Sequence, residues 1–176
     1  MKFIITGTGR CGTGFMSKVV GCGHEEVFGV DGPGAFKEGD SSWMAAPYLQ
    51  DYSCPKIHVV RDPADVLPSL YGCKGLFVGR ASQYGSFINR WGPRDVYLFY
   101  EAWTAHCDRE CDLIVKVEDP DYSAIDELLG VECSRVVPEG YNRRVATNVL
   151  DVDTGFVSVA RERYGYSSKH ILRKRK

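Results

Sequence analysis

The sequence predicts an α/β fold, a three-layer sandwich built on a central parallel sheet. Short apolar runs that are typical of buried strands occur at 2–6, 56–60 and 113–117. Each run leads into a segment that carries a helix start signal or helical spacing. Strands that alternate with helices favour a parallel sheet covered on both faces, because each crossover helix packs back onto the sheet. Ligands of such sheets bind at the carboxyl ends of the strands.

The first strand is followed by a glycine-rich turn and a helix. We expect this helix over 13–20, because Gly21 and Gly23 are good stop signals. Residues 26–30 favour a short strand. The next stretch, 31–40, is rich in glycine and acidic side chains, and it therefore predicts a loop.

Capping residues indicate two more helices in the middle of the chain. Ser41 or Ser42 is expected to cap a short helix over 43–50. The pair Asp62–Pro63 places an N-cap residue before a proline at the first helical position. It therefore predicts a helix over 63–71, directly after the second buried strand.

The second half of the chain repeats the alternation after a glycine-rich stretch over 72–93, which is long enough to form a lid or a substrate loop. The elements expected next are a helix over 93–111, a strand over 113–117, a helix over 122–129 that Gly130 closes, and a last helix over 153–164. The length fits one domain, which we assign to 1–166, followed by a basic tail over 167–176.

Composition restricts the class of protein. The chain has 176 residues, 44% of them hydrophobic and 26% charged, and a net charge of −1, so we expect no nucleic-acid partner. No apolar run approaches the roughly 20 residues that span a bilayer, and the start of the chain reads as a strand without the features of a signal peptide. The seven cysteines are odd in number and scattered, which favours reduced thiols in the cytoplasm and no metal site.

The segment Ile4–Met16 carries the clearest functional signal. An apolar strand ends in a glycine-rich turn that opens a helix, and this order forms a cradle for a phosphate or sulfate group. Gly7 and Gly12 have the spacing of a kinase-type loop, but the lysine that should follow the second glycine is missing. The basic residue is Arg10, inside the loop. The loop is therefore expected to bind an anion in a manner that differs from ATP or GTP binding.

A second signal lies where the strand over 56–60 ends. Arg61 follows this strand, and Ser69 comes eight residues later, about two helical turns on. An arginine fork and a hydroxyl are suited to holding a phosphate. Taken alone, Arg61 could equally form a local ion pair with Asp62 or Asp65. His58, inside the same strand, is interpreted as a core histidine.

Together these features resemble the sulfotransferase superfamily, whose members have a P-loop NTPase-like fold. In that family a basic residue, any residue, a glycine and two hydroxyl residues follow the first strand, and Arg10–Gly14 stands in this place. A later strand ends in an arginine with a serine eight residues on, as Arg61 and Ser69 do. The segment Lys116–Asp119 is similar to the late strand that ends in Glu-Asp. The short loop looks most like compact bacterial or phage members.

The resemblance implies transfer of a sulfuryl group from 3′-phosphoadenosine-5′-phosphosulfate to a hydroxyl or amine of a small molecule, a carbohydrate or a lipid. The product nucleotide would be adenosine 3′,5′-bisphosphate. Arg10 stands where many members have a catalytic lysine, and Gly14 replaces the second hydroxyl residue. The residues that the resemblance assigns to the nucleotide are Gly9, Arg10, Cys11, Gly12, Thr13 and Gly14 at the 5′ end, and Arg61 and Ser69 at the 3′ end.

Such a transfer needs a base that accepts the proton of the acceptor. The candidates after the first helix are His24, Glu25, Glu26 and Asp31. The resemblance favours Glu25, with His24 second, and with Arg10 these are the candidate catalytic residues. The helix itself runs about 12 Å away from the loop, which would instead favour Asp31.

Two other functions stay open at this point. One is a nucleotide kinase or nucleoside triphosphatase with an altered loop, for which Arg61–Asp62 would be the strand end that holds magnesium. The other is a module that binds an adenine nucleotide without catalysis. These alternatives differ in whether a nucleotide with a 3′-phosphate is preferred over ATP with magnesium.

Overall fold

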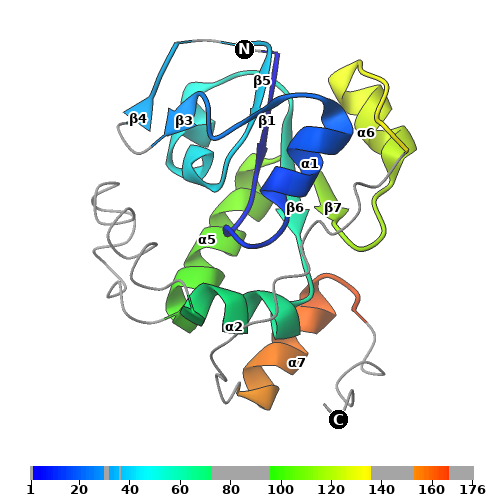
Figure 1. Cartoon of the computed structure of the whole chain (residues 1–176). Coiled ribbons are helices and arrows are strands. Elements are labelled where there is room, and N and C mark those ends of the chain that lie inside the picture. Colours follow the sequence, from blue (N-terminus) through cyan, green and yellow to red (C-terminus); the bar gives the residue numbers. More distant parts are fainter. Residues whose placement is uncertain (1, 30–31, 36, 73–95, 136–152, 167–176) are drawn as a thin grey trace.

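The computed structural model, shown in Figure 1, describes most of the chain between Lys2 and Tyr166. The candidate base Asp31, most of the expected lid over 72–93 and the basic tail over 167–176 lie outside the described residues. The described residues are 2–29, 32–35, 37–72, 96–135 and 153–166.

The described part of the chain contains a five-stranded sheet in the order β2-β5-β1-β6-β7, and every neighbouring pair is parallel. A separate antiparallel pair, β3 with β4, follows β2. The predicted α/β fold with a central parallel sheet is therefore confirmed. The strands are β1 Phe3–Thr6, β2 Gly23–His24, β3 Phe28–Gly29, β4 Gly32–Pro33, β5 Gly39–Ser41, β6 Lys56–Val60 and β7 Leu113–Lys116.

The helices begin and end close to the predicted residues. Gly21 and Gly130 end α1 and α6 in left-handed conformations, with φ of 73° and 64°, as their sequence positions predict. Ser42 caps the 3-10 helix η1 by accepting a hydrogen bond from the Met44 amide. The helices are α1 Thr13–Val20, η1 Trp43–Asp51, α2 Pro63–Gly72, α5 Val96–Glu110, α6 Tyr122–Leu129 and α7 Thr154–Arg163. None of the helices within the described ranges is long and apolar enough to cross a membrane.

Helices cover both faces of the sheet (Figure 1). Ser41 lies in register with Ile5, and its hydroxyl donates to the carbonyl of Thr13 at the start of α1. His58, one row further along, bonds Asp108 on α5 through Nδ1 at 2.7 Å. Successive strand residues point to opposite faces, so α1 and α5 lie on opposite sides. This layering is compatible with the predicted three-layer sandwich.

The core lies between these layers. Ile4, Ile5 and Ile57 from the central strands, Met16 from α1 and Trp103 from α5 are all fully buried. Burial of each such side chain stabilises the fold by about 1.5–3 kcal/mol. His58 is also fully buried, as predicted. The packing fixes the two central strands whose carboxyl ends lead into the glycine loop and into Arg61.

Of the two predictions around residue 30, the loop over 31–40 is wrong and the short strand within 26–30 is confirmed in part. The stretch 31–40 is not only a loop, because it contains β4 and leads into β5, which lies between β2 and β1. The short strand predicted over 26–30 is present as Phe28–Gly29 and belongs to the separate pair. The strand of the main sheet that follows α1 is Gly23–His24, which was not predicted. Strands β2 and β5 are too short and too polar for an alternating or apolar pattern to identify them.

Candidate functional site

The glycine loop between β1 and α1 has an unusual backbone. Gly9, Arg10 and Gly12 have φ of 70°, 57° and 114°. For Arg10 this left-handed conformation costs about 1–2 kcal/mol, because its Cβ crowds the following carbonyl. Strain of this kind is common where a binding loop needs a particular shape. Gly9 and Gly12 therefore occupy positions where the backbone requires a positive φ. Arg10 adopts the same conformation at a cost in free energy.

The loop is fixed from the side of α5. The indole Nε1 of Trp103 donates a hydrogen bond of 2.9 Å to the carbonyl of Gly7. A Cβ atom at Gly7 would lie 2.4 Å from both the Cys11 Sγ and the Val59 carbonyl oxygen, so only glycine fits there. The loop is consequently shaped by packing before any ligand arrives.

The candidate residue Cys11 faces the interior. Its side chain is 1% exposed, and burial raises the pKa of the thiol to about 11. A thiol that stays protonated and buried is neither a nucleophile nor an anion ligand. Cys11 can therefore serve an anion only through its backbone amide.

The first turn of α1 presents backbone groups in the same way. Gly12 is the N-cap, and no side chain in the described part of the chain caps this helix. The Thr13 side chain is buried, whereas Gly14 is half-buried and carries no side chain. The amides of a helix's first turn attract an anion, because they lack partners within the helix and lie at the positive end of its dipole.

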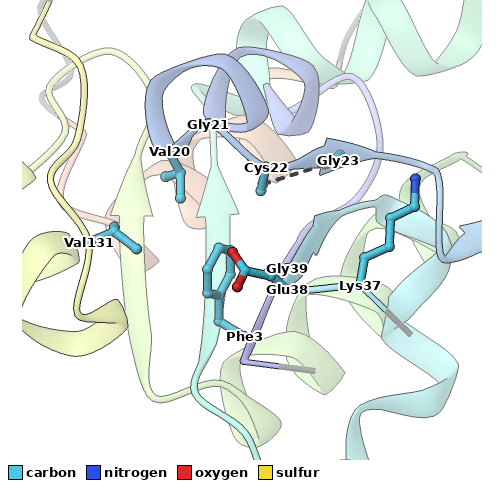
Figure 2. A pocket seen from close by; sticks show the side chains of 9 residues that line it. All are labelled: Phe3, Val20, Gly21, Cys22, Gly23, Lys37, Glu38, Gly39 and Val131. Atoms are coloured by element: carbon cyan, nitrogen blue, oxygen red, sulfur yellow. Dashed lines mark hydrogen bonds between the residues drawn. The ribbon is translucent and has the colours of Figure 1, made fainter. Parts of the chain in front are cut away.

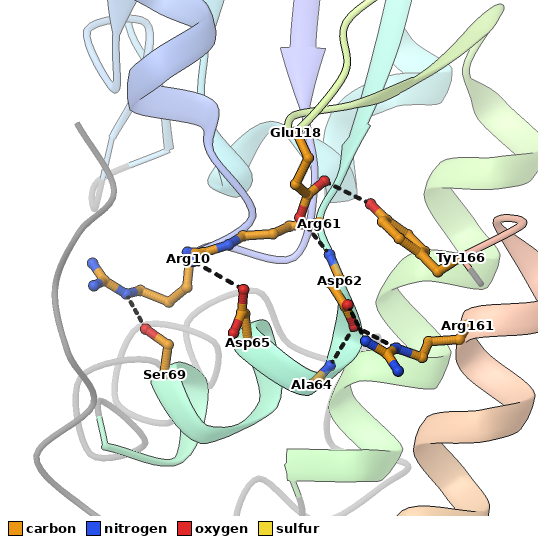
Figure 3. A network of polar contacts seen from close by, with 9 residues as sticks. All are labelled: Arg10, Arg61, Asp62, Ala64, Asp65, Ser69, Glu118, Arg161 and Tyr166. Atoms are coloured by element: carbon orange, nitrogen blue, oxygen red, sulfur yellow. Dashed lines mark hydrogen bonds and ion pairs between the residues drawn. The ribbon is translucent and has the colours of Figure 1, made fainter. Parts of the chain in front are cut away.

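Arg10 and Ser69 are in direct contact (Figure 3). The Nε of Arg10 donates a hydrogen bond of 2.9 Å to the Ser69 hydroxyl on α2. Arg61 reaches the same helix, where its Nη2 lies 3.5 Å from a carboxylate oxygen of Asp65. Asp65 and Ser69 are one helical turn apart and therefore share a face of α2. The structure thus brings together the loop arginine and the second predicted constellation.

Asp62 forms hydrogen bonds through both its carboxylate and its backbone amide. Its carboxylate accepts from the Ala64 amide at 2.9 Å, which confirms the predicted N-cap of α2. The same carboxylate forms a two-point ion pair with Arg161 of α7, whose Nε lies 2.8 Å from Oδ1. Its backbone amide donates to the Glu118 carboxylate at 2.8 Å, and the Tyr166 hydroxyl donates to the other Glu118 oxygen at 2.9 Å.

Sequence reasoning did not identify Arg161 or Tyr166, and it used Glu118 only as a weak motif match. No local spacing signals the pair between Arg161 and Asp62, because 99 residues separate them. Residues that follow a strand end are visible in a sequence, but their distant partners are not. An arginine inside the apolar pattern of the last helix, where Val157 and Ala160 are also buried, was the one available hint.

The candidate bases His24 and Glu25 lie at the carboxyl edge of the sheet. His24 is in register with Ser41, which in turn pairs with Ile5 of β1. The chain therefore leaves α1 at the end of the sheet far from the glycine loop and returns along β2 to the carboxyl end. His24 and Glu25 lie at the same end of the sheet as the loop, although α1 leads away from it. Since β2 is two strands from β1, its end lies about 10 Å from the end of β1.

Glu25 differs from the other described candidates. It is half-buried and has a left-handed backbone with φ of 57°, and its amide donates to the Ser41 carbonyl at 3.3 Å. His24 is exposed. Glu26 is paired with Lys37, and this hydrogen bond lowers the pKa of the Glu26 carboxyl, which makes it a weaker base. The turn that carries Glu25 is the strained one.

The buried carboxylate of Asp40 on β5 holds this turn. Its two oxygens accept hydrogen bonds from the amides of Glu26, Val27 and Phe28 at 3.0–3.1 Å. Asp40 is fully buried, and a carboxylate in such a place requires partners of this kind. The loop that the composition of 31–40 predicts would include Asp40, so this role cannot be inferred from the sequence.

A separate hollow of about 460 Å³ lies at the opposite edge of the sheet (Figure 2). It is lined by Phe3 and Gly39, where β1 and β5 begin, and by Gly21, where α1 ends. It is therefore distinct from the loop and from Arg61. Across the described ranges, no group of three or more histidine, cysteine, aspartate or glutamate side chains is placed to hold a metal ion.

The site therefore consists of a strained glycine loop, two arginines and a serine at the carboxyl edge of a parallel sheet, with Glu25 on the neighbouring side of that edge. This arrangement can hold anionic groups at two places. Comparisons with protein-family models, with curated proteins and with solved structures find no match to this chain.

Proposed function

We propose that this chain binds 3′-phosphoadenosine-5′-phosphosulfate and transfers its sulfuryl group to a hydroxyl or amine acceptor. The observation that carries the proposal is the hydrogen bond of 2.9 Å between Arg10 and Ser69. It joins the glycine loop to the helix that follows Arg61. A nucleotide with phosphates on both its 5′ and 3′ oxygens needs cationic groups of this kind within one crevice.

The residues present fit this nucleotide at both ends. The loop amides from Gly9 to Gly14 and the Arg10 guanidinium would hold the 5′ end. Arg61 and Ser69 would hold the 3′-phosphate, and Arg61 would exchange its 3.5 Å contact with exposed Asp65 for a shorter, charge-assisted bond. The bound nucleotide supplies the activated sulfuryl group.

The side chains then have distinct tasks. Arg10 would neutralise the negative charge that builds up on the leaving phosphate, and because arginine stays protonated it acts by charge and hydrogen bonding only. Glu25 would accept the proton of the acceptor hydroxyl, since it follows the sheet edge on a fixed turn and Glu26 is occupied by Lys37. Alignment of the two reactants supplies much of the remaining rate.

The kinase alternative is less well supported. Its magnesium would need the Asp62 carboxylate, which here pairs with Arg161 and caps α2. Its loop would also need a lysine after Gly12, where the chain has Thr13. Both features favour a nucleotide that is bound through arginines.

Thermal unfolding of the full chain with different nucleotides tests the proposal. Adenosine 3′,5′-bisphosphate at about 100 times its Kd, without magnesium, should stabilise the fold by about 2.7 kcal/mol and raise Tm by about 5–10 °C. ATP with magnesium at the same concentration should raise Tm much less. Stabilisation by ATP with magnesium but not by the bisphosphate would overturn the proposal and favour the kinase alternative.

A further inference from the structure

Arg161 lies in α7, far from the glycine loop in the sequence, yet its side chain is only 3% exposed. Its Nε and Nη2 atoms both bond the Asp62 carboxylate, and its Nη1 atom is buried without a hydrogen-bond partner among the described residues. A buried ion pair contributes little net stability, because removing both charges from water costs about as much as their attraction returns. Stability alone therefore does not explain this arginine.

The partner of Arg161 controls the backbone next to Arg61. Asp62 is fixed at its carboxylate by Arg161 and at its amide by Glu118. Glu118 is itself held by the Tyr166 hydroxyl, which follows α7. Figure 3 shows how these side chains converge on the turn between β6 and α2 from two directions.

Arg61 depends on this turn for its position. Its own ion pair with Asp65 is long, at 3.5 Å, and the Asp65 side chain is 62% exposed. The Arg61 side chain itself is 19% exposed, but a long pair with one exposed partner contributes little and does not by itself fix the position of the guanidinium. Arg61 directly precedes Asp62, so the bonds that hold the Asp62 amide and carboxylate also restrict the backbone that carries the Arg61 side chain.

We propose that Arg161 is a positioning residue, which, with Glu118, fixes the Arg61 turn so that the site prefers a nucleotide with a 3′-phosphate. This inference rests on the proposed function. Arg161 acts through Asp62 and touches no ligand. It anchors Asp62 so that Arg61 and the first turn of α2 are in place before the nucleotide binds, which lowers the ordering cost of binding.

The test is the ratio of two dissociation constants, measured by calorimetry on the full chain for adenosine 5′-phosphate and for adenosine 3′,5′-bisphosphate. The wild type should bind the bisphosphate more tightly, and Arg61→Ala should bring the ratio close to one. Arg161→Lys keeps the charge but loses the two-point fork, and it should lower the ratio about tenfold while adenosine 5′-phosphate affinity stays within about twofold. Glu118→Gln should lower the ratio about threefold.

Two further variants separate positioning from stability. In the double variant Asp62→Asn with Arg161→Met, no buried charge is left unpaired and asparagine still caps α2, so the fold should be retained while the ratio falls. Glu101→Gln is the matched control. Glu101 forms an ion pair of 3.1 Å with Arg163, which lies on α7 like Arg161, and it makes no contact with Asp62 among those given for the described residues. This control should keep the wild-type ratio.

Each outcome bears on a different claim. A wild-type ratio near one would remove the proposed function itself. A clear wild-type preference that survives in both Arg161→Lys and the double variant would overturn the positioning role. Equal losses of both affinities together with a lower Tm would also overturn it, because they indicate a structural role. Should Arg161→Lys fail to fold, the double variant and Glu118→Gln, whose side chain is exposed, decide the question.

Discussion

Glu25 shows at the scale of one residue how the site is built. Its φ of 57° is a conformation that side chains other than glycine adopt at a cost, and its amide bonds the Ser41 carbonyl. The Glu25 side chain therefore projects from a turn whose next three backbone amides donate hydrogen bonds to Asp40. A general base benefits from such fixation, because proton transfer requires a defined distance to the acceptor.

Glu25→Gln should therefore abolish turnover and leave nucleotide binding intact. The amide side chain has the same shape but cannot take up a proton at neutral pH, and a lost general base lowers the rate by about 10²–10⁴-fold. Sulfuryl transfer and bisphosphate affinity would be measured on the same preparation. His24→Gln is the neighbouring control and should keep most of the activity. Full activity in Glu25→Gln would assign the base to another residue.

The glycine pattern of the loop indicates part of its backbone shape but not the burial of its side chains. The positive φ of Gly9 and Gly12 agrees with the glycine pattern, whereas that of Arg10 could not be predicted from it. That the side chains of Cys11 and Thr13 are buried could not be predicted, because it depends on α5 and β5 packing against the loop from other parts of the chain.

Strand β5 is held in the sheet by close packing and hydrogen bonds, without an apolar pattern of its own. Gly39 lies so close to the Phe3 ring that an added Cβ would be 2.3 Å from it. The side chains of Asp40 and Ser41 form hydrogen bonds with backbone groups. A strand of three residues, two of them polar, has no apolar pattern. Its place in the sheet is determined by partners that the linear sequence does not display, whereas β6 and the helices with clear caps were predicted to within a few residues.

Asp40→Asn should destabilise the fold by about 2–4 kcal/mol, because the new amide nitrogen faces a backbone N–H and leaves a buried donor unsatisfied. The free energy of unfolding in urea measures the loss. Hydrogen exchange at the amides of Val27 and Phe28 should accelerate, since both bond Asp40. Asp51→Asn, at an exposed position, is the control. An unchanged unfolding free energy in Asp40→Asn would contradict the role assigned to this carboxylate.

At the scale of the whole molecule, α5 connects the loop, the core and η1. Trp103 holds Gly7, while His106, three residues on, donates from Nε2 to the Ala46 carbonyl of η1 at 2.8 Å. The other ring nitrogen of His106 accepts from Arg109 at 2.9 Å. Burial, together with the Arg109 charge, lowers the pKa of His106 below its ordinary value of 6.5.

This lowered pKa predicts how stability depends on pH. The unfolded chain binds a proton at His106 more readily than the folded chain, so the free energy of unfolding should fall as the pH drops below 6.5. His106→Gln can keep the bond to Ala46 without titrating, and its loss of stability between pH 7 and 5 should be smaller than that of the wild type. Urea unfolding at several pH values would measure both. Identical pH profiles would show that His106 does not carry this dependence.

The ion pair between Arg161 and Asp62 also has a consequence for how the chain reaches its native state. The two residues are 99 positions apart, so the turn that carries Arg61 cannot be completed by any early, local folding event. During synthesis the glycine loop and α2 emerge long before their anchor exists. Completion of the candidate site is therefore expected to be a late step, which separates the formation of secondary structure from the formation of the site.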